Sequence, residues 1–439
     1  DHRDLHSFPT RRSSDLKKGI ISSSLLSLIA KGVAFIQQIS IVYCCGVSST
    51  TDIHFYLYNL AILIGGMIQI ITSSILIPRS MEMRINKSHI SEMKYLNSFF
   101  ILLIGIGILG MFLLGIIGKV FMTLITNFNL EDIQHNYLIY LLFLPTTLLL
   151  SINSFLAEIF VSYKYFTAPI ILNLGLNLCI ILSVLLFHNQ IGGFSMMAGA
   201  LSLAFIAFIC FIYKMKQILH WNFRIWNFKL LKTSFQPILG LIANQSIVII
   251  VSTYPFYLLS QLPIGSVSIV NYAMKLIQAP YGIMQQIAIV LQVKLNELHA
   301  QKKESELYNI THKIARNIFI IGLIIAILTY AMRYPIIHII YGLANIPTNA
   351  MLQLSTIIGI GIFSLPLIGF GQVWVKLYFT QRRIKTYIYT MTIMNFISCG
   401  IYHIFILYFQ ISGYAIAYTL AESLMAIALW YKIRKTDIK

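Results

Sequence analysis

The chain has 439 residues, of which 58% are hydrophobic and only 10% are charged. Soluble domains carry roughly 25% charged residues, so this composition excludes a soluble globular protein and indicates a polytopic membrane protein. The net charge of +18 would suggest nucleic-acid binding in a soluble protein, but here it must first be compared with membrane topology.

The first sixteen residues differ in character from the rest of the chain. They read DHRDLHSFPTRRSSDL, are polar, and lack the apolar region of a signal peptide. We interpret residues 1–16 as a non-native leader, similar to a translated sequencing adapter, and we assign no function to them.

Apolar runs that are long enough to cross a bilayer follow the leader. A spanning helix needs about 20 residues. Twelve spans are predicted, at 19–46, 54–78, 97–126, 137–157, 167–187, 193–213, 237–259, 265–292, 315–334, 349–376, 386–410 and 412–432. The predicted fold class is therefore an all-α polytopic membrane protein.

Lysine and arginine are distributed unequally between alternate loops. After the leader, 25 of them lie on one predicted side, whereas the other side holds only Lys119 and Arg333. Positive residues concentrate on the cytoplasmic side of a membrane, so we predict that both termini lie in the cytoplasm. Because topology accounts for the charge, no nucleic-acid partner is expected. Residues 294–317 are predicted to form a cytoplasmic interfacial helix before the ninth span.

The predicted spans divide into two groups of six. Residues 17–213 form an N-terminal bundle, 214–236 a basic cytoplasmic linker, and 237–439 a C-terminal bundle. An offset of 216 residues aligns YLYNLAILIGGMIQII at 56–71 with YAMKLIQAPYGIMQQI at 272–287, which suggests a parallel repeat. Transporters with such repeats bind their substrate between the halves, so we predict two six-helix bundles around a central cavity.

Two lysines interrupt the apolar spans. Lys31 lies in the first span and Lys275 in the eighth, each near the middle of the bilayer. A lysine there costs about 2.5–3.5 kcal/mol, so it either satisfies neighbouring polar groups or serves a function. One lysine in each half, without matching buried acids, favours a wet cavity that binds an anion, because lysine is a common phosphate ligand.

Further polar side chains accompany the two lysines. Each offers hydrogen bonds to a substrate but would also suit an interhelical tie: Gln37, Gln38, Asn59, Gln278 and Gln285. Asp52 and His54 lie at the predicted outer mouth of the first two spans, where we expect either a solvated helix end or N-cap, or an outer gate with Asp52 as the gating residue. Glu422 is an intramembrane acid, for which we expect an ion pair or a cation-coupling site.

Motifs of several other protein classes are absent from the sequence. It contains no GxxxxGK[ST], HExxH or GxSxG, and its five cysteines have no CxxC or Cys/His spacing. We therefore expect a transporter rather than an enzyme, without a metal, another cofactor or ATP.

Three segments resemble MurJ-type lipid II flippases of the multidrug/oligosaccharidyl-lipid/polysaccharide exporter superfamily. GVSSTTDIHFYLYNL at 46–60 resembles the turn after the first span of that family. VNYAMKLIQAPYGIMQQIAIVLQVKL at 270–295 resembles its eighth span, and VKLYFTQRRIKTYIY at 375–389 resembles the segment after its tenth. The resemblance implies a flippase that moves an undecaprenyl-pyrophosphate-linked saccharide, lipid II, by alternating access.

The resemblance also implies roles for individual residues. Basic residues of a central cavity bind the pyrophosphate in the family, and they match Lys31 and Lys275 here. Asp52 matches an acidic residue at the outer end of the first span. Met274 stands where the family has an acid before the basic residue of the eighth span.

Other positions depart from the family pattern. Gln37 replaces a second arginine of the first span, and Gly65 and Gly66 replace a basic pair. The twelve predicted spans compare with fourteen that are usual in the family, whose location, implied here as well, is the bacterial inner membrane. An O-antigen or polysaccharide-unit flippase therefore stays open as the alternative.

Two rival classes have less support. A drug/cation antiporter needs intramembrane carboxylates, in which this chain is poor. A membrane glycosyltransferase needs a catalytic loop outside the bilayer, and no predicted outer loop is long enough. Membrane potential, H⁺ or Na⁺ is the expected source of drive.

Overall fold

The computed structural model describes residues 8–342, 346–381 and 383–437, which are helical with short connections and contain no strand. The chain forms two compact units. The first holds α1 and residues Ile53–Ile250, and the second holds residues Gly46–Asp52 and the chain from Val251 onward. The predicted division at 214–236 stays a prediction.

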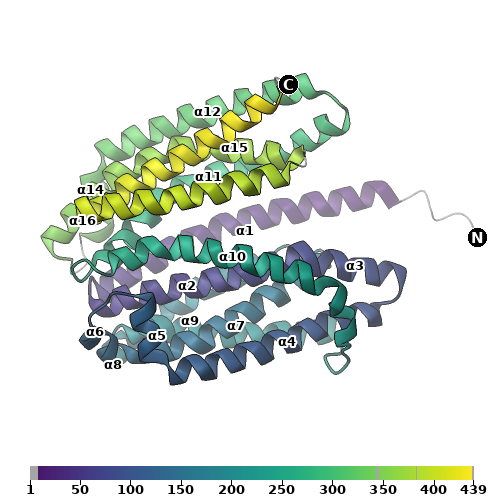
Figure 1. Cartoon of the computed structure of the whole chain (residues 1–439), viewed down its shortest axis with the longest axis horizontal. Coiled ribbons are helices and arrows are strands. Elements are labelled where there is room, and N and C mark those ends of the chain that lie inside the picture. The colour runs from purple at the N-terminus through teal and green to yellow at the C-terminus, as the bar shows by residue number, and fades with distance from the viewer. Residues whose placement is uncertain (1–7, 343–345, 382, 438–439) are drawn as a thin grey trace, which may run out of the picture. The chain divides into compact units, whose positions relative to one another are not determined.

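The first unit is a bundle of long helices with short connectors. Its elements are α1 (Phe8–Cys45), α2 (Ser49–Ile71, from Ile53), the π-helical η1 (Thr72–Leu76), α3 (Ile77–Asn86), α4 (His89–Ile116), α5 (Gly118–Ile125), α6 (Leu130–His135), α7 (Tyr137–Ser162), α8 (Ala168–Ile191), α9 (Phe194–Leu219), the 3₁₀ turn η2 (Phe228–Leu231) and most of α10 (Lys232–Leu259). Helix α9 packs between α7 and α8, while α1 lies along α8 and α4 along α7 (Figure 1).

The second unit is built around α15. Its elements are α11 (Ser266–Ala300), α12 (Glu304–Ala331), α13 (Arg333–Tyr341), α14 (Thr348–Gly361), the 3₁₀ turn η3 (Ile362–Ser364), α15 (Leu365–Thr380) and α16 (Ile384–Asp437). Helix α15 packs against α11, α12 and α16, and α14 packs against α11 and α16 (Figure 1).

Local sequence explains several helix ends in the first unit. The Ser88 hydroxyl accepts a hydrogen bond from the Ser91 N–H and so caps α4. Pro169 lies in the first turn of α8, where its missing N–H costs no helical hydrogen bond. Gly192 ends α8 with φ +56°, a conformation that glycine adopts without steric penalty.

Ten helical segments are long and apolar enough to span a membrane. One of them, Lys385–Ile433, covers both predicted spans 386–410 and 412–432. Helix α11 covers all but the first residue of the predicted span 265–292, but it is not one of these ten segments, which are counted among the described residues only. The all-α polytopic prediction is confirmed, whereas the count of twelve spans is not.

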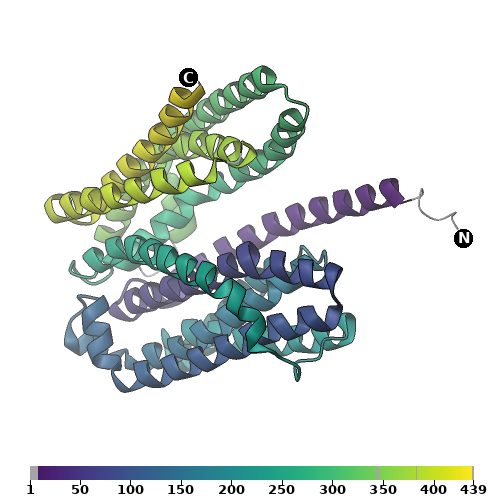
Figure 2. The same ribbon diagram turned by 45° about the vertical axis from the view of Figure 1, so that its right-hand side comes forward.

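Helix α16 turns back on itself at Gln410. That residue has φ +51° and ψ −132°, which no helix contains. The rings of Tyr402 and Tyr414 are 5.4 Å apart, although twelve residues of straight helix would rise about 18 Å. The two arms separate at this bend (Figure 2), so α16 consists of two helices in hairpin arrangement.

The predicted interfacial helix at 294–317 is wrong in its bounds. Residues up to Ala300 belong to α11, and α12 starts at Glu304 and continues without a break into the ninth predicted span. Lys302 between them has φ +57°, and the Lys303 N–H bonds to the Leu298 carbonyl, which closes the end of α11. The polar residues of this stretch therefore form the ends of two longer helices.

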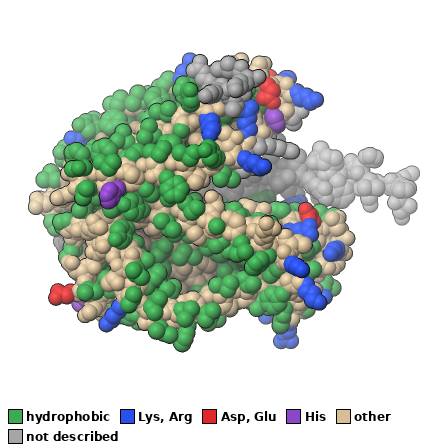
Figure 3. Space-filling view, in the orientation of Figure 1, with side chains coloured by type: hydrophobic (Ala, Val, Ile, Leu, Met, Phe, Trp, Pro, Cys, Tyr) green, Lys and Arg blue, Asp and Glu red, His purple; other side chains and the backbone are tan. Residues whose placement is uncertain are grey.

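The surface of each unit carries the pattern of a membrane protein. Ile106, Phe112 and Leu124 of the first unit are more than half exposed. Apolar side chains cover the flanks of the helices, and Lys and Arg side chains gather toward one end of them (Figure 3). An apolar flank of this extent would be unusual on a soluble monomer, whereas lipid satisfies it.

Candidate functional site

Lys31 and Gln38 share one face of α1. They are seven residues apart, which is close to two helical turns. The Lys31 side chain is exposed, whereas Gln38 is 1% exposed, and its Nε2 has no hydrogen-bond partner in the described part of the chain. Gln37 is also buried but lies about 120° around the helix from Lys31. This face of α1 therefore offers an ammonium group and an amide donor.

Helix α2 presents polar groups at its start. His54 is fully buried, and its ring stacks on Tyr58 at 5.4 Å and meets the edge of Phe55 at 5.5 Å. Neither ring nitrogen has a hydrogen-bond partner among the described residues. Asn59 is half-buried one turn further along.

Lys275 and Gln278 lie together on α11. Both side chains are exposed, and their spacing of three residues places them one turn apart on the same face. Tyr272 and Ile277 are buried on the packed side of this helix. The side chain of Gln285 lies outside the described residues. Lys31 belongs to the first unit and Lys275 to the second, so a cavity shared by the two lysines stays a prediction.

Asp52 caps the start of α11. Its carboxylate is 2% exposed and accepts hydrogen bonds from the Gly265 N–H at 2.6 Å and the Ser268 N–H at 2.7 Å. The Ser268 hydroxyl also donates to it. These N–H groups have no partner inside the helix, and the positive end of the helix dipole favours the carboxylate. Asp52 is therefore a buried cap of α11 and not a solvated helix end, and its gate role stays a prediction.

Glycine is required beside this cap. Gly265 has φ +95°, and a Cβ atom there would approach Cγ1 of Val47 to 2.1 Å. The Tyr272 hydroxyl donates to the Gly46 carbonyl at 2.7 Å, which fixes the same segment to α11. The connection 46–52 is therefore held tightly against α11 within the second unit.

Glu422 stands among tyrosines. Tyr281, Tyr402, Tyr414 and Tyr418 interact electrostatically with its half-buried carboxyl group. In the described part of the chain no lysine or arginine forms an ion pair with Glu422. Sequence reasoning identified the acid but missed the aromatic ring set, because the set depends on the bend of α16.

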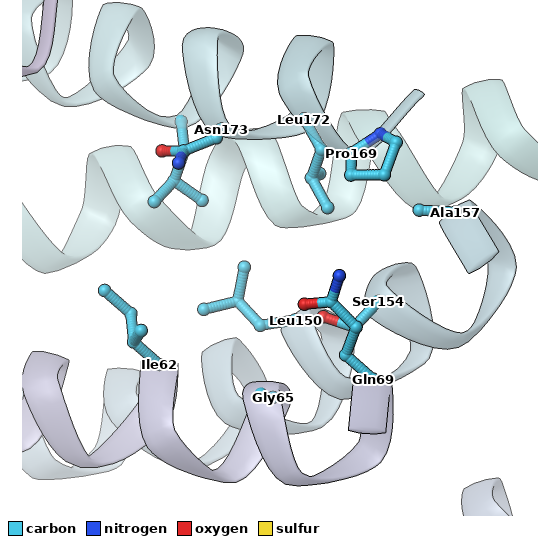
Figure 4. Close-up of a pocket in the computed structure, with 11 residues that line it drawn as sticks. Ile62, Gly65, Gln69, Leu150, Ser154, Ala157, Pro169, Leu172 and Asn173 are labelled. Atoms are coloured by element: carbon cyan, nitrogen blue, oxygen red, sulfur yellow. The ribbon is translucent and has the colours of Figure 1, made fainter. Parts of the chain in front are cut away.

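A cavity of about 210 Å³ opens in the first unit between α2, α7 and α8 (Figure 4). Its polar lining comes from Gln69, Ser154 and Asn173, and the rest is apolar or glycine. Gly65 and Gly66 form part of the wall, and a Cβ atom on Gly66 would meet nothing within 4 Å. The sequence signal for this cavity was the glycine pair, where the resembling family has basic residues.

Comparison with known proteins decides the family. The sequence model of the family described as "Lipid II flippase MurJ" matches residues 41–439. The chain belongs to the MurJ family of lipid II flippases. The family match, together with ten apolar helices among the described residues, confirms the prediction of a multi-pass bacterial membrane protein.

Curated relatives agree with the family match. A probable lipid II flippase MurJ of Buchnera aphidicola from Acyrthosiphon pisum is 30% identical over 293 residues, which cover 62% of this chain and 54% of that protein. The alignment thus spans about half the length of this relative. A probable lipid II flippase MurJ of Borreliella burgdorferi is 24% identical over 446 residues, covering 97% of this chain and 85% of that protein.

Solved structures share the fold. A lipid II flippase MurJ in an inward closed conformation matches with a TM-score of 0.79 and 17% identity, over 94% of this chain and 87% of that one. A multidrug resistance MATE transporter of the MOP superfamily in an inward-facing conformation matches with a TM-score of 0.67 and 11% identity, over 94% and 98%. These likenesses show that the fold of this chain is shared with both transporters.

Proposed function

We propose that this chain carries lipid II, an undecaprenyl-pyrophosphate-linked saccharide, across the bacterial inner membrane by alternating access. The observation that carries the proposal is the MurJ family match over residues 41–439. Both termini lie in the cytoplasm in this proposal, because 25 basic residues fall on that side against two on the other.

The two intramembrane lysines bind the pyrophosphate in this proposal. Lys31 is exposed, and the buried amide donor of Gln38 lies two turns further along the same face of α1, while Lys275 is exposed one turn from Gln278. An ammonium group offers three donors to phosphate oxygens, and the amides add neutral hydrogen bonds. The saccharide crosses in the wet cavity while the lipid tail stays in the bilayer.

Transport needs no ATP in this proposal. An inside-negative potential moves an anion outward with about 2.3 kcal/mol per charge per 100 mV. Glu422 is the proposed site for H⁺ or Na⁺ coupling, because it is an acid without a described ion-pair partner and tyrosine hydroxyl groups surround it. Asp52 is the proposed outer gate, opening when its hydrogen bonds to the start of α11 break.

Complementation tests the substrate. The chain is expressed in a strain depleted of its lipid II flippase and in a strain that lacks its O-antigen flippase. We expect rescue of growth in the first strain and no O-antigen in the second. A Lys119→Ala variant, changed at an exposed lysine outside the proposed site, should rescue equally. Rescue of the O-antigen strain alone would favour the alternative substrate, which the comparisons do not support.

A further inference from the structure

Glu158 is a buried acid that the proposed transport site does not use. It lies four residues before the end of α7 and is 9% exposed. The side-chain amide of Gln69 on α2 donates to its Oε1 at 2.7 Å. A carboxylate in such a place is costly unless it is paired with a cation or takes up a proton.

No cation compensates this carboxyl group within the described residues. Helices α3, α4, α8 and α9 pack against α7. The charged or titratable groups that these helices and the turn after α7 bring to this end of the unit are Arg79, Glu82, Arg84, His89, Glu92, Lys94, Tyr95, Tyr163, Lys164, Tyr165, Tyr213, Lys214 and Lys216. Among them Arg79 pairs with Glu82 and Arg84 approaches Glu92, while no ion pair reaches Glu158.

The neighbouring cavity gives water access to this pair. Gln69 lines the cavity of Figure 4 together with Ser154 and Asn173, whose side chains approach it from α7 and α8. A volume of about 210 Å³ exceeds the roughly 10–15 Å³ that one water needs. The three polar groups supply the partners that hold water there, so a proton can reach Gln69 and the acid behind it.

The amide of Gln69 makes the cavity sensitive to the charge of Glu158. An ionised carboxylate accepts only, so Gln69 must donate to it and leaves its carbonyl oxygen for other partners. A protonated carboxyl group can donate to that carbonyl oxygen, which frees the NH₂ group instead. When Glu158 takes up a proton, Gln69 therefore presents its NH₂ donor to the cavity in place of its carbonyl acceptor.

We propose that Glu158 and Gln69 form a proton-binding site on the wall of the α2–α7–α8 cavity, separate from the lysines of the transport site. A proton suits this site because one carboxyl oxygen and one amide are enough to hold it. A sodium ion would require several oxygen ligands, whereas Gln69 is the side chain that the described residues place in hydrogen-bond contact with Glu158.

Infrared difference spectroscopy on the purified full-length chain in lipid nanodiscs tests the proposal without a transport assay. Spectra are compared between alkaline and acid buffer. The wild-type chain should gain the carbonyl band of a protonated carboxyl group, and Glu158→Gln should lose that band while keeping an amide hydrogen bond to Gln69. Glu131→Gln, at an exposed acid of α6, is the control and should retain the Glu158 band.

A second variant keeps the test decisive if Glu158→Gln fails to fold. Gln69→Leu leaves the acid and removes its partner, so the band should persist at higher frequency. The proposal is overturned if Glu158→Gln shows the wild-type band, or if the band in Gln69→Leu is unmoved. The spectra are also compared between Na⁺ and K⁺ buffers at the same pH. A change in the carboxylate band between these two buffers would identify a metal-cation site and would also overturn the proposal.

Discussion

At the scale of single residues, unusual polarity in apolar runs was the most informative signal. Lys31 and Lys275 could be singled out from sequence because an ammonium group in an apolar span has a high insertion cost. Their exposed side chains agree with groups that are available to a ligand. The unpaired amide of Gln38 was not predictable, because its burial depends on which side of α1 packs against α8.

The Asp52 cap leads to a stability prediction at the same scale. Asp52→Asn keeps an acceptor oxygen but removes the charge that meets the start of α11, so unfolding should become easier by about 1 kcal/mol. Thermal unfolding of the detergent-purified chain measures this effect. Glu131→Gln, at an exposed acid of α6, is the control and should unfold like the wild type. Equal midpoints for Asp52→Asn and the control would show that the cap contributes no stability.

At the scale of elements, span positions were largely predictable and breaks within them were not. Eighteen or more apolar residues indicate a spanning helix directly. The separation of α4 from α5 and the junction near Lys302 depend on individual backbone angles that residue type alone does not reveal. The hairpin of α16, in contrast, bends at Gln410, where the predicted spans 386–410 and 412–432 meet. The tyrosines around Glu422 come together only through that hairpin.

The bend at Gln410 predicts a stabilising substitution. Its φ of +51° with ψ of −132° is a conformation that glycine accepts and a side chain strains, at a cost of about 1–3 kcal/mol. Gln410→Gly should therefore raise the thermal midpoint of the purified chain. Gln381→Gly is the comparison, because Gln381 already has negative φ, and it should give no increase. A lower midpoint for Gln410→Gly than for Gln381→Gly would argue against the strained bend.

At the scale of the whole molecule, composition and charge were sufficient to predict a polytopic membrane protein. The segments 46–60, 270–295 and 375–389 were sufficient to predict the family. The arrangement of the two halves around a cavity stays a prediction, because sequence gives two sets of spans without their packing. The leader at 1–16 also stays a prediction, with α1 starting at Phe8 inside it.

Topology gives a direct test at this scale. Ser305→Cys lies in the polar start of α12 and Asn129→Cys just before α6, and both positions are exposed. In a chain without its native cysteines, a membrane-impermeant thiol reagent added from the periplasm should label Asn129→Cys only. Labelling of Ser305→Cys from the periplasm would reverse the proposed orientation.

Lipid II flipping in proteoliposomes, measured per molecule of reconstituted protein, tests the lysine site most directly. Lys31→Ala and Lys275→Ala each remove a charge-assisted phosphate contact of about 1.5–3 kcal/mol, so each should lower the flipping rate by about tenfold or more. Membrane abundance should remain near normal, because alanine also removes the insertion cost of a lysine in an apolar span. Lys→Arg at either position should retain part of the rate. Lys119→Ala, the exposed control, should flip like the wild type. Normal flipping per molecule in both alanine variants would contradict a pyrophosphate site at Lys31 and Lys275.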